Sequence, residues 1–374
     1  MVSICYNWRY ALIGIIIYFI MLLIAKPHVT YSNPPKNRGA KGVSFFFILF
    51  IANSVYGLWA ADTYHVWESF KVASHYARFE LISYEEVYNW LGGIIGNNYF
   101  LWRLFVWLPA CLFMYFTATL LDLKNRNFLL ALALFAGFAA YTRGMLGHTM
   151  MLFGTILYIK NDKIRLKLLG IVFVAISYFF HKSMFVNILF ALIALYPFGK
   201  NIIQTSFVAF PFLTLLATYI INSILLGFEI APENEMISNT ALIYASDEST
   251  KSNTTGIIAK IIQYLPEYLT LIYLYNRIVV KKYLSGVKNE KAFNYLFRLT
   301  YVSIYISSLF LFVETSNWIY LRFKYMAFFP LVFILGKIWN LEPKSNKWIK
   351  SIIFFQLFAL LYKYMYLLYQ WFKL

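Results

Sequence analysis

Long apolar runs alternate with short polar clusters along the whole chain. Dividing the sequence at these clusters gives about twelve apolar segments, most of them roughly 15–25 residues long, which is the length scale of membrane helices. Because a backbone in lipid must satisfy its own hydrogen bonds, we expect all of them to be helical. They fall near residues 8–25, 43–61, 99–121, 128–142, 144–159, 168–181, 184–197, 202–227, 256–276, 299–313, 319–336 and 351–371. The pattern predicts an all-α polytopic membrane protein.

The composition agrees with this pattern. Of the 374 residues, 61% are hydrophobic and only 13% are charged, whereas a soluble domain is about 45–50% apolar and about 25% charged. A soluble enzyme and a disordered chain are therefore excluded. We expect residues 1–374 to form a single integral membrane domain.

The charges fall into alternate loops. One set of loops holds 21 of the 33 Lys and Arg residues but only 4 of the 16 acids, and so carries the whole net charge of +17. Basic loops stay cytoplasmic, which with twelve spans would place both termini outside. Because the cations are spread over these loops and form no stripe, nucleic acid is excluded as a partner. The loops are 26–42, 122–127, 160–167, 197–201, 277–298 and 337–350.

Two segments on the opposite, outer side are long. Residues 62–98 are amphipathic and aromatic, and we expect them to lie along the outer membrane boundary. Residues 228–255 are polar and are expected to form an outer loop.

Two pairs of spans are unusually short. Residues 128–159 contain one full charge, Arg143, and residues 168–196 contain His181 near their middle. Helices of about 16 residues are about 24 Å long, less than the roughly 30 Å hydrocarbon core. Arg143 and His181 would then lie at similar depth inside the membrane, where ionisable groups are functional candidates. The alternatives are a thinned bilayer or an outward-reaching Arg143, and an ordinary polar helix cap at His181.

Two further arginines lie near the outer ends of expected helices. Arg322 is a binding candidate, although a structural ion pair with Glu314 is the alternative. Arg103 is a weaker candidate, and an interfacial anchor beside Trp102 and Trp107 is the favoured interpretation. Several arginines that converge from the outer side suggest a phosphate or diphosphate ligand, because guanidinium binds phosphate bidentately and stays charged.

Familiar soluble-enzyme motifs are absent from the sequence. It contains no Gly-rich phosphate loop, no HExxH pair and no GxSxG elbow. Asp62, His65 and Glu68 are spaced by three residues, which would place them on one helix face. A metal site is therefore an alternative there, but a solvated helix start is the favoured interpretation. We expect neither a metal nor a cofactor.

Five short motifs resemble those of the EpsG/Wzy-type bacterial polysaccharide polymerases, in the same order over about residues 50–335. The sequence lacks the proline of the second motif, and Gly144 replaces the glutamine of the third. The motifs are Ala61–Tyr64 (like G-x-D-Y), Tyr84–Tyr88 (like E-P-x-Y), Tyr141–Leu146 (like R-Q-x-(L/I)-A), Phe179–Ser183 (like F-H-x-S) and Leu321–Tyr325 (like R-F-x-x-Y).

The resemblance implies a GT-C-like membrane glycosyltransferase. Such an enzyme joins polyprenyl-diphosphate-linked oligosaccharides, as both donor and acceptor, on the outer face of the bacterial cytoplasmic membrane. Arg143 and Arg322 become candidates to hold the diphosphate, and Asp62 or His181 becomes the candidate general base. A chain-length regulator is a candidate partner. Candidate substrate-binding residues are Tyr64, Glu86, Arg103, His148 and Lys182.

Three other functions remain as alternatives. An O-antigen-type ligase uses the same donor, but usually needs a larger outer domain than residues 228–255 offer. A flippase or other transporter would need two matching halves and polar groups at mid-membrane. A membrane O-acyltransferase would need a donor site on the cytoplasmic side, where the loops offer only Lys, Arg and His28.

Overall fold

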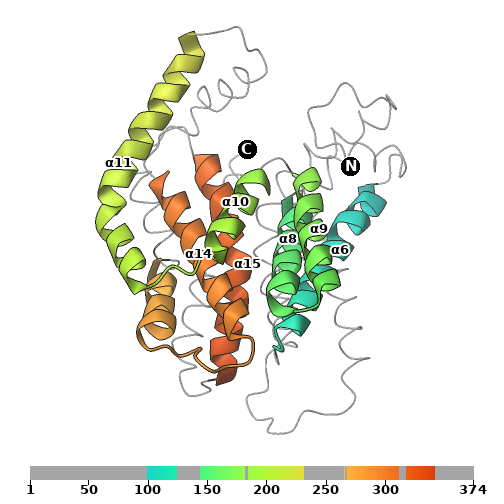
Figure 1. The fold of residues 1–374 in the computed structure, drawn as a ribbon. Coiled ribbons are helices and arrows are strands. Elements are labelled where there is room, and N and C mark those ends of the chain that lie inside the picture. The colour runs from blue at the N-terminus through green and yellow to red at the C-terminus, as the bar shows by residue number, and fades with distance from the viewer. Residues whose placement is uncertain are drawn as a thin grey trace, which may run out of the picture. The chain divides into compact units, whose positions relative to one another are not determined.

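Helices make up all the regular structure in the part of the chain that the computed structural model describes, namely residues 99–123, 144–181, 184–230, 265, 268–310 and 317–341 (Figure 1). The α-helices are α6 (Tyr99–Leu120), α8 (Gly144–Lys160), α9 (Ile164–Ser177), α10 (Met184–Leu195), α11 (Lys200–Ile230), α14 (Glu290–Leu309) and α15 (Asn317–Leu341). A short 3-10 helix, η1 (Tyr178–Phe180), and a π-helix, η3 (Tyr275–Val280), complete the set.

These helices confirm the expected all-α architecture over the described ranges. Each α-helix overlaps an expected apolar segment, and most ends agree within a few residues. The π-helix η3 continues to Val280, four residues into the expected basic loop 277–298. The largest difference is α14, which begins at Glu290, whereas a start at 299 was expected. The expected helices at 8–25, 43–61, 128–142 and 351–371, and the outer segments 62–98 and 231–255, lie outside the described residues, so the count of twelve stays a prediction.

Residues Lys200–Ile220 of α11 are apolar and long enough to cross a membrane, while Met184–Leu195 and Tyr268–Val280 are shorter apolar helices. One face of α11 is formed by apolar side chains that leave more than 70% of their surface exposed: Val208, Phe212, Leu215 and Tyr219. They recur at intervals of four, three and four residues, so they form a stripe along the helix. A stripe of this kind suits contact with lipid and would be a liability in water.

The chain divides into two compact units. The first contains Met1–Leu189, Leu331–Ser351 and Leu360–Leu374, and the second contains Phe190–Pro330 and Ile352–Ala359. Each unit is described by itself below.

In the first unit, α8 is the central helix and packs against both α6 and α9. Most of its residues are buried, in agreement with its even distribution of apolar side chains. Phe113, Phe153 and Phe173, one from each helix, form a cluster with ring centroids 5.3–5.4 Å apart. Aromatic packing of this kind fixes the three helices side by side.

Two glycines allow α8 and α9 to approach so closely that their backbones are in contact. A Cβ atom at Gly154 would lie 2.6 Å from the carbonyl oxygen of Gly170, and one at Gly170 would lie 2.5 Å from that of Gly154. Small residues at such crossings are typical of helix pairs in membranes, where dispersion contacts drive association.

The ends of α6 and α8 lie together. The Lys160 ammonium donates a hydrogen bond to the carbonyl oxygen of Leu120 and lies 3.7 Å from the Asp122 carboxylate. Helices α6 and α8 therefore run in the same direction, and α9 returns in the opposite direction after a short turn (Figure 1). The described beginnings of two expected basic loops, at Asp122 and Lys160, thus share one end of this unit.

In the second unit, α14 packs against α11. The Tyr301 hydroxyl bonds that of Ser206, and the Tyr305 hydroxyl donates to the Ser206 carbonyl oxygen at 2.6 Å. In the middle of α14, the Arg298 Nε donates to the carbonyl oxygen of Ala194, in α10, at 2.7 Å. These bonds explain how the polar side chains involved are accommodated among largely apolar helices.

The glycine contact generates a stability prediction. We expect Gly154→Ala to destabilise the protein by about 1–3 kcal/mol, because the new Cβ meets a backbone oxygen that cannot rotate away. Gly199→Ala is the matched control, since no atom lies within 4 Å of its Cβ position. Thermal unfolding in detergent should show a lower Tm for Gly154→Ala only. Equal Tm values for both variants would contradict the close packing.

Candidate functional site

The candidate site lies where short helices of the first unit begin or end. Helix α8 begins at Gly144, directly after Arg143, and α10 begins at Met184, shortly after His181. The 17, 14 and 12 residues of α8, α9 and α10 correspond to lengths of about 25, 21 and 18 Å. All three are shorter than the roughly 30 Å hydrocarbon core, as the sequence predicted.

His181 connects two helical segments in an extended conformation. Its φ of −166° and ψ of 130° end the η1 turn, and its N–H bonds the Tyr178 carbonyl oxygen at 3.3 Å. Its own carbonyl oxygen accepts the Met184 N–H at 2.8 Å, which starts α10. The side chain is buried, with only 6% of the residue exposed. His181 is thus a buried ionisable residue at a sharp reversal between apolar helices, not an exposed cap.

A second buried histidine contacts an asparagine that the sequence analysis did not single out. The Asn187 amide nitrogen lies 3.5 Å from Nδ1 and 3.4 Å from Nε2 of His148. Both residues are almost fully buried, at 2% and 1% exposure. Either unprotonated ring nitrogen can accept a hydrogen bond from this amide, so the pair couples α8 to α10 through polar groups.

The carbonyl oxygen of the Asn187 side chain is buried and receives no hydrogen bond within the described part of the chain. Its amide nitrogen also lies 3.4 Å from the Met184 sulfur. A buried amide oxygen without a donor costs free energy, and such groups in native proteins are often functional. Asn187 therefore offers an acceptor to a ligand hydroxyl or amide.

Gly147 brings three helix ends to this point. A Cβ atom there would lie 3.0 Å both from the Ser177 carbonyl oxygen at the end of α9 and from the Met184 side chain at the start of α10. The residue after Gly147 is His148, and Met184 lies three residues after His181. The beginning of α8, the end of α9 and the beginning of α10 thus converge on one polar cluster.

Most other predicted site residues fall beyond the described ranges. Asp62, Tyr64, Glu86, Arg143 and Lys182 lie outside the described residues. The backbones of Arg103 and Arg322 lie within the first two turns of α6 and α15, as expected, but their side chains are not described. Of the candidates, the structure thus places His148 and His181 at the convergent ends and adds Asn187.

A signal for Asn187 was present in the sequence. It is the one polar residue in the otherwise apolar stretch Met184–Leu195. A polar side chain in an apolar helix is costly unless it finds a partner, and this makes it a site candidate. The identity of that partner, 39 residues away along the chain, is set by the packing of α10 on α8.

Within the described ranges, no three His, Cys, Asp or Glu residues lie close enough together to hold a metal ion. The alternative metal site at Asp62, His65 and Glu68 falls outside those ranges.

Comparison with known proteins adds one finding. No curated protein and no solved structure matches the chain. The model of the EpsG family matches residues 40–373 and agrees with the resemblance carried by the five short motifs. Since this match extends over most of the chain, the protein belongs to the EpsG family.

Proposed function

We propose that this protein is a membrane glycosyltransferase that polymerises polyprenyl-diphosphate-linked oligosaccharide repeat units on the outer face of the bacterial cytoplasmic membrane. Family membership suggests a function of the polysaccharide-polymerase type in a membrane. The observation that carries the more specific proposal is the buried contact between His148 and Asn187 at the convergent helix ends. Buried His181 precedes α10 by three residues, and Arg143 directly precedes α8 in the sequence. Polar groups inside short apolar helices suit a lipid-linked sugar substrate.

In the proposed reaction, a hydroxyl oxygen of the acceptor glycan attacks the anomeric carbon of the donor. The new carbon–oxygen bond forms as the bond to the polyprenyl diphosphate breaks, and the diphosphate leaves with both electrons. The hydroxyl proton passes to a general base, for which Asp62 and His181 are the candidates. No cofactor enters this balance.

The arginines act on the leaving group. Negative charge grows on the diphosphate as the bond breaks, and preorganised guanidinium groups stabilise charge at that moment. Arg143 and Arg322 have this role in the proposal, with Arg103 and Lys182 as further cations near the substrate. Tyr64 and Glu86 are proposed to contact the sugars.

The His148–Asn187 pair is proposed to orient the acceptor. The Asn187 carbonyl oxygen, which has no donor among the described residues, accepts a hydrogen bond from a glycan hydroxyl, while the Asn187 amide contacts the imidazole. A site that pairs with a substrate hydroxyl discriminates strongly against substrates that lack it, because its own buried group is otherwise left unpaired.

The first test is the size distribution of lipid-linked and surface glycan in a strain that lacks the gene. We expect collapse to single repeat units on the outer leaflet. Long chains that stay attached to the lipid, with none transferred to the surface, would identify a ligase instead. Single repeats trapped on the cytoplasmic leaflet would identify a flippase.

The role of Arg143 is tested by substitution. We expect Arg143→Ala to abolish polymerisation while the protein still inserts, and Arg143→Lys to be poorly active because an ammonium cannot form the bidentate fork. Arg165→Ala is the matched control, because Arg165 is an exposed arginine at the other end of α8 and α9. Glycan gels of the complemented deletion strain measure the outcome, and normal long chains from Arg143→Ala would refute the assignment.

The His148–Asn187 pair is tested by a double-mutant cycle. We expect His148→Ala and Asn187→Leu each to slow polymerisation in vesicles by about tenfold or more, since each removes one partner of a buried hydrogen bond. If the pair acts as a unit, the double variant is no slower than the worse single variant. Protein abundance and Tm serve as controls, and strictly multiplicative rate losses would show that the two residues act separately.

A further inference from the structure

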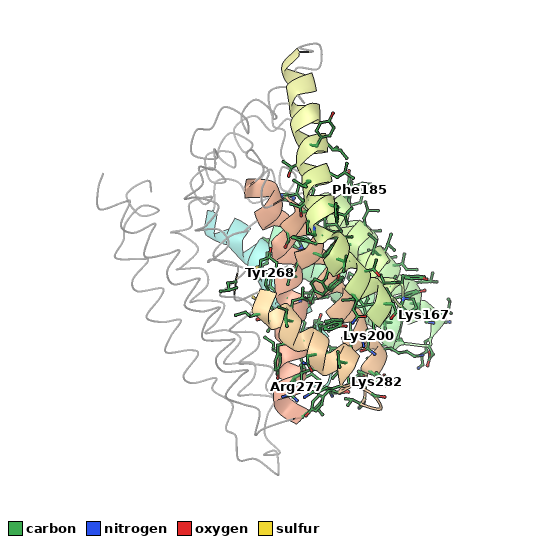
Figure 2. The ribbon with its side chains drawn as sticks, turned by 90° about the vertical axis from the view of Figure 1, so that its left-hand side faces the viewer. Lys167, Phe185, Lys200, Tyr268, Arg277 and Lys282 are labelled. Carbon is green, nitrogen blue, oxygen red and sulfur yellow. The ribbon has the colours of Figure 1, made fainter. Side chains whose placement is uncertain are left out.

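A dense group of cations begins near the end of the helical segment Tyr268–Val280 of the second unit and continues after it. Between residues 277 and 291 the chain carries five cations and a single acid, Glu290. This is one of the expected cytoplasmic loops. Figure 2 shows Lys200, Arg277 and Lys282 toward the lower end of the ribbon, where α11 begins. The cations are Arg277, Lys281, Lys282, Lys288 and Lys291.

Arg277 is held between two aromatic rings. Its guanidinium carbon lies 5.5 Å from the ring centroid of Tyr273 and 5.8 Å from that of Tyr283. The Tyr283 N–H bonds the Arg277 carbonyl oxygen at 2.9 Å, which holds the backbones of these two residues together. Both distances are within the range of cation–π attraction. A guanidinium placed against ring faces presents its N–H groups in its own plane, in the fork that matches phosphate.

The turn after the π-helix carries Lys281 and Lys282 and is bonded to the Glu290 side chain. Lys282 has a φ of 50°, in the left-handed region, so the chain reverses sharply there. The Glu290 carboxylate accepts a hydrogen bond from the Gly286 N–H at 2.8 Å and so closes the turn. Lys281 and Lys282 are exposed. The turn therefore presents a strongly positive surface to its surroundings.

An apolar stripe leads along the helix to these cations. Leu265, Leu269, Ile272, Asn276 and Val280 are exposed and recur at intervals of four, three, four and four residues, which places them on one helix face. Four of the five are apolar, and Leu269, Ile272 and Val280 each expose half or more of their surface. An apolar face that ends in a cationic cluster complements the two parts of an anionic phospholipid. The apolar face suits the acyl chain, and the cations suit the phosphate.

We propose that the Tyr273–Arg277–Tyr283 clamp and the adjoining lysines bind the head-group phosphate of an anionic phospholipid in the leaflet on the side of the basic loops. Keeping a loop on the cytoplasmic side requires only positive charge near the membrane. This cluster also places the Arg277 guanidinium against the rings of Tyr273 and Tyr283. Basic clusters directly beside a membrane helix attract anionic lipids. The inference is independent of the reaction proposed above.

The test uses the full-length protein in phosphatidylcholine vesicles that contain a small fraction of photo-crosslinkable phosphatidylglycerol. Labelling of the peptide spanning residues 268–291 is measured by mass spectrometry. We expect Arg277→Ala to lower this labelling about fivefold, the factor contributed by one cation near an anionic surface. Arg277→Lys should lie between wild type and Arg277→Ala, and added salt should weaken labelling of the wild type.

Two further variants keep the result interpretable. Lys281→Ala with Lys282→Ala changes only exposed side chains and should also reduce labelling, even if Arg277→Ala proves unstable. Lys163→Ala is the matched control, because Lys163 is an exposed cation of another basic loop and should leave labelling of residues 268–291 unchanged. Equal labelling by a phosphatidylcholine probe, or unchanged labelling in the Arg277 and Lys281–Lys282 variants, would overturn the proposal.

Discussion

The contact between the backbones of Gly154 and Gly170 determines the arrangement of the first unit. Each glycine lies against the carbonyl oxygen of the other, so the α8–α9 distance is set by main-chain atoms. Between helices in lipid there is no hydrophobic effect to drive association. Close packing of complementary surfaces drives it instead. Once α8 and α9 are fixed, Gly147 brings the end of α9 and the start of α10 against α8. The buried His148 and Asn187 meet as a result.

Both units bury polar side chains, and both leave some of them without a hydrogen bond in the described part of the chain. In the second unit, the hydroxyls of Tyr301 and Tyr305 and the guanidinium of Arg298 bond to oxygens of neighbouring helices. The buried hydroxyls of Tyr273, Tyr275 and Ser303 receive no such bond there. In the first unit, the Asn187 carbonyl oxygen stays buried without a donor in the described part of the chain. Asn187 differs from these hydroxyls in its contact with a buried histidine where three helix ends converge, and this position supports a role in substrate contact.

Much of the helical layout was predictable, because in a membrane protein the polar clusters mark the helix ends. The boundaries around residues 160 and 200 agree closely, and the short helices beside Arg143 and His181 follow from counting residues between charges. The start of α14 was placed too late because Arg298 was interpreted as part of a loop, whereas it lies within the helix and bonds Ala194. The His148–Asn187 contact was not predictable, since it depends on how α8 and α10 rotate about their axes. The same rotation decides which glycines face each other.

Helix α11 has 31 residues, a length of about 46 Å, whereas a membrane's hydrocarbon core is roughly 30 Å thick. Tilts of membrane helices rarely exceed about 40°, and even at that angle the helix would span about 35 Å along the membrane normal. In the proposed orientation, the last turns of α11 therefore stand in the head-group layer. The length of α11 then sets the height above the bilayer at which the polar segment after Ile230 begins, and so the distance at which that segment can meet a growing glycan.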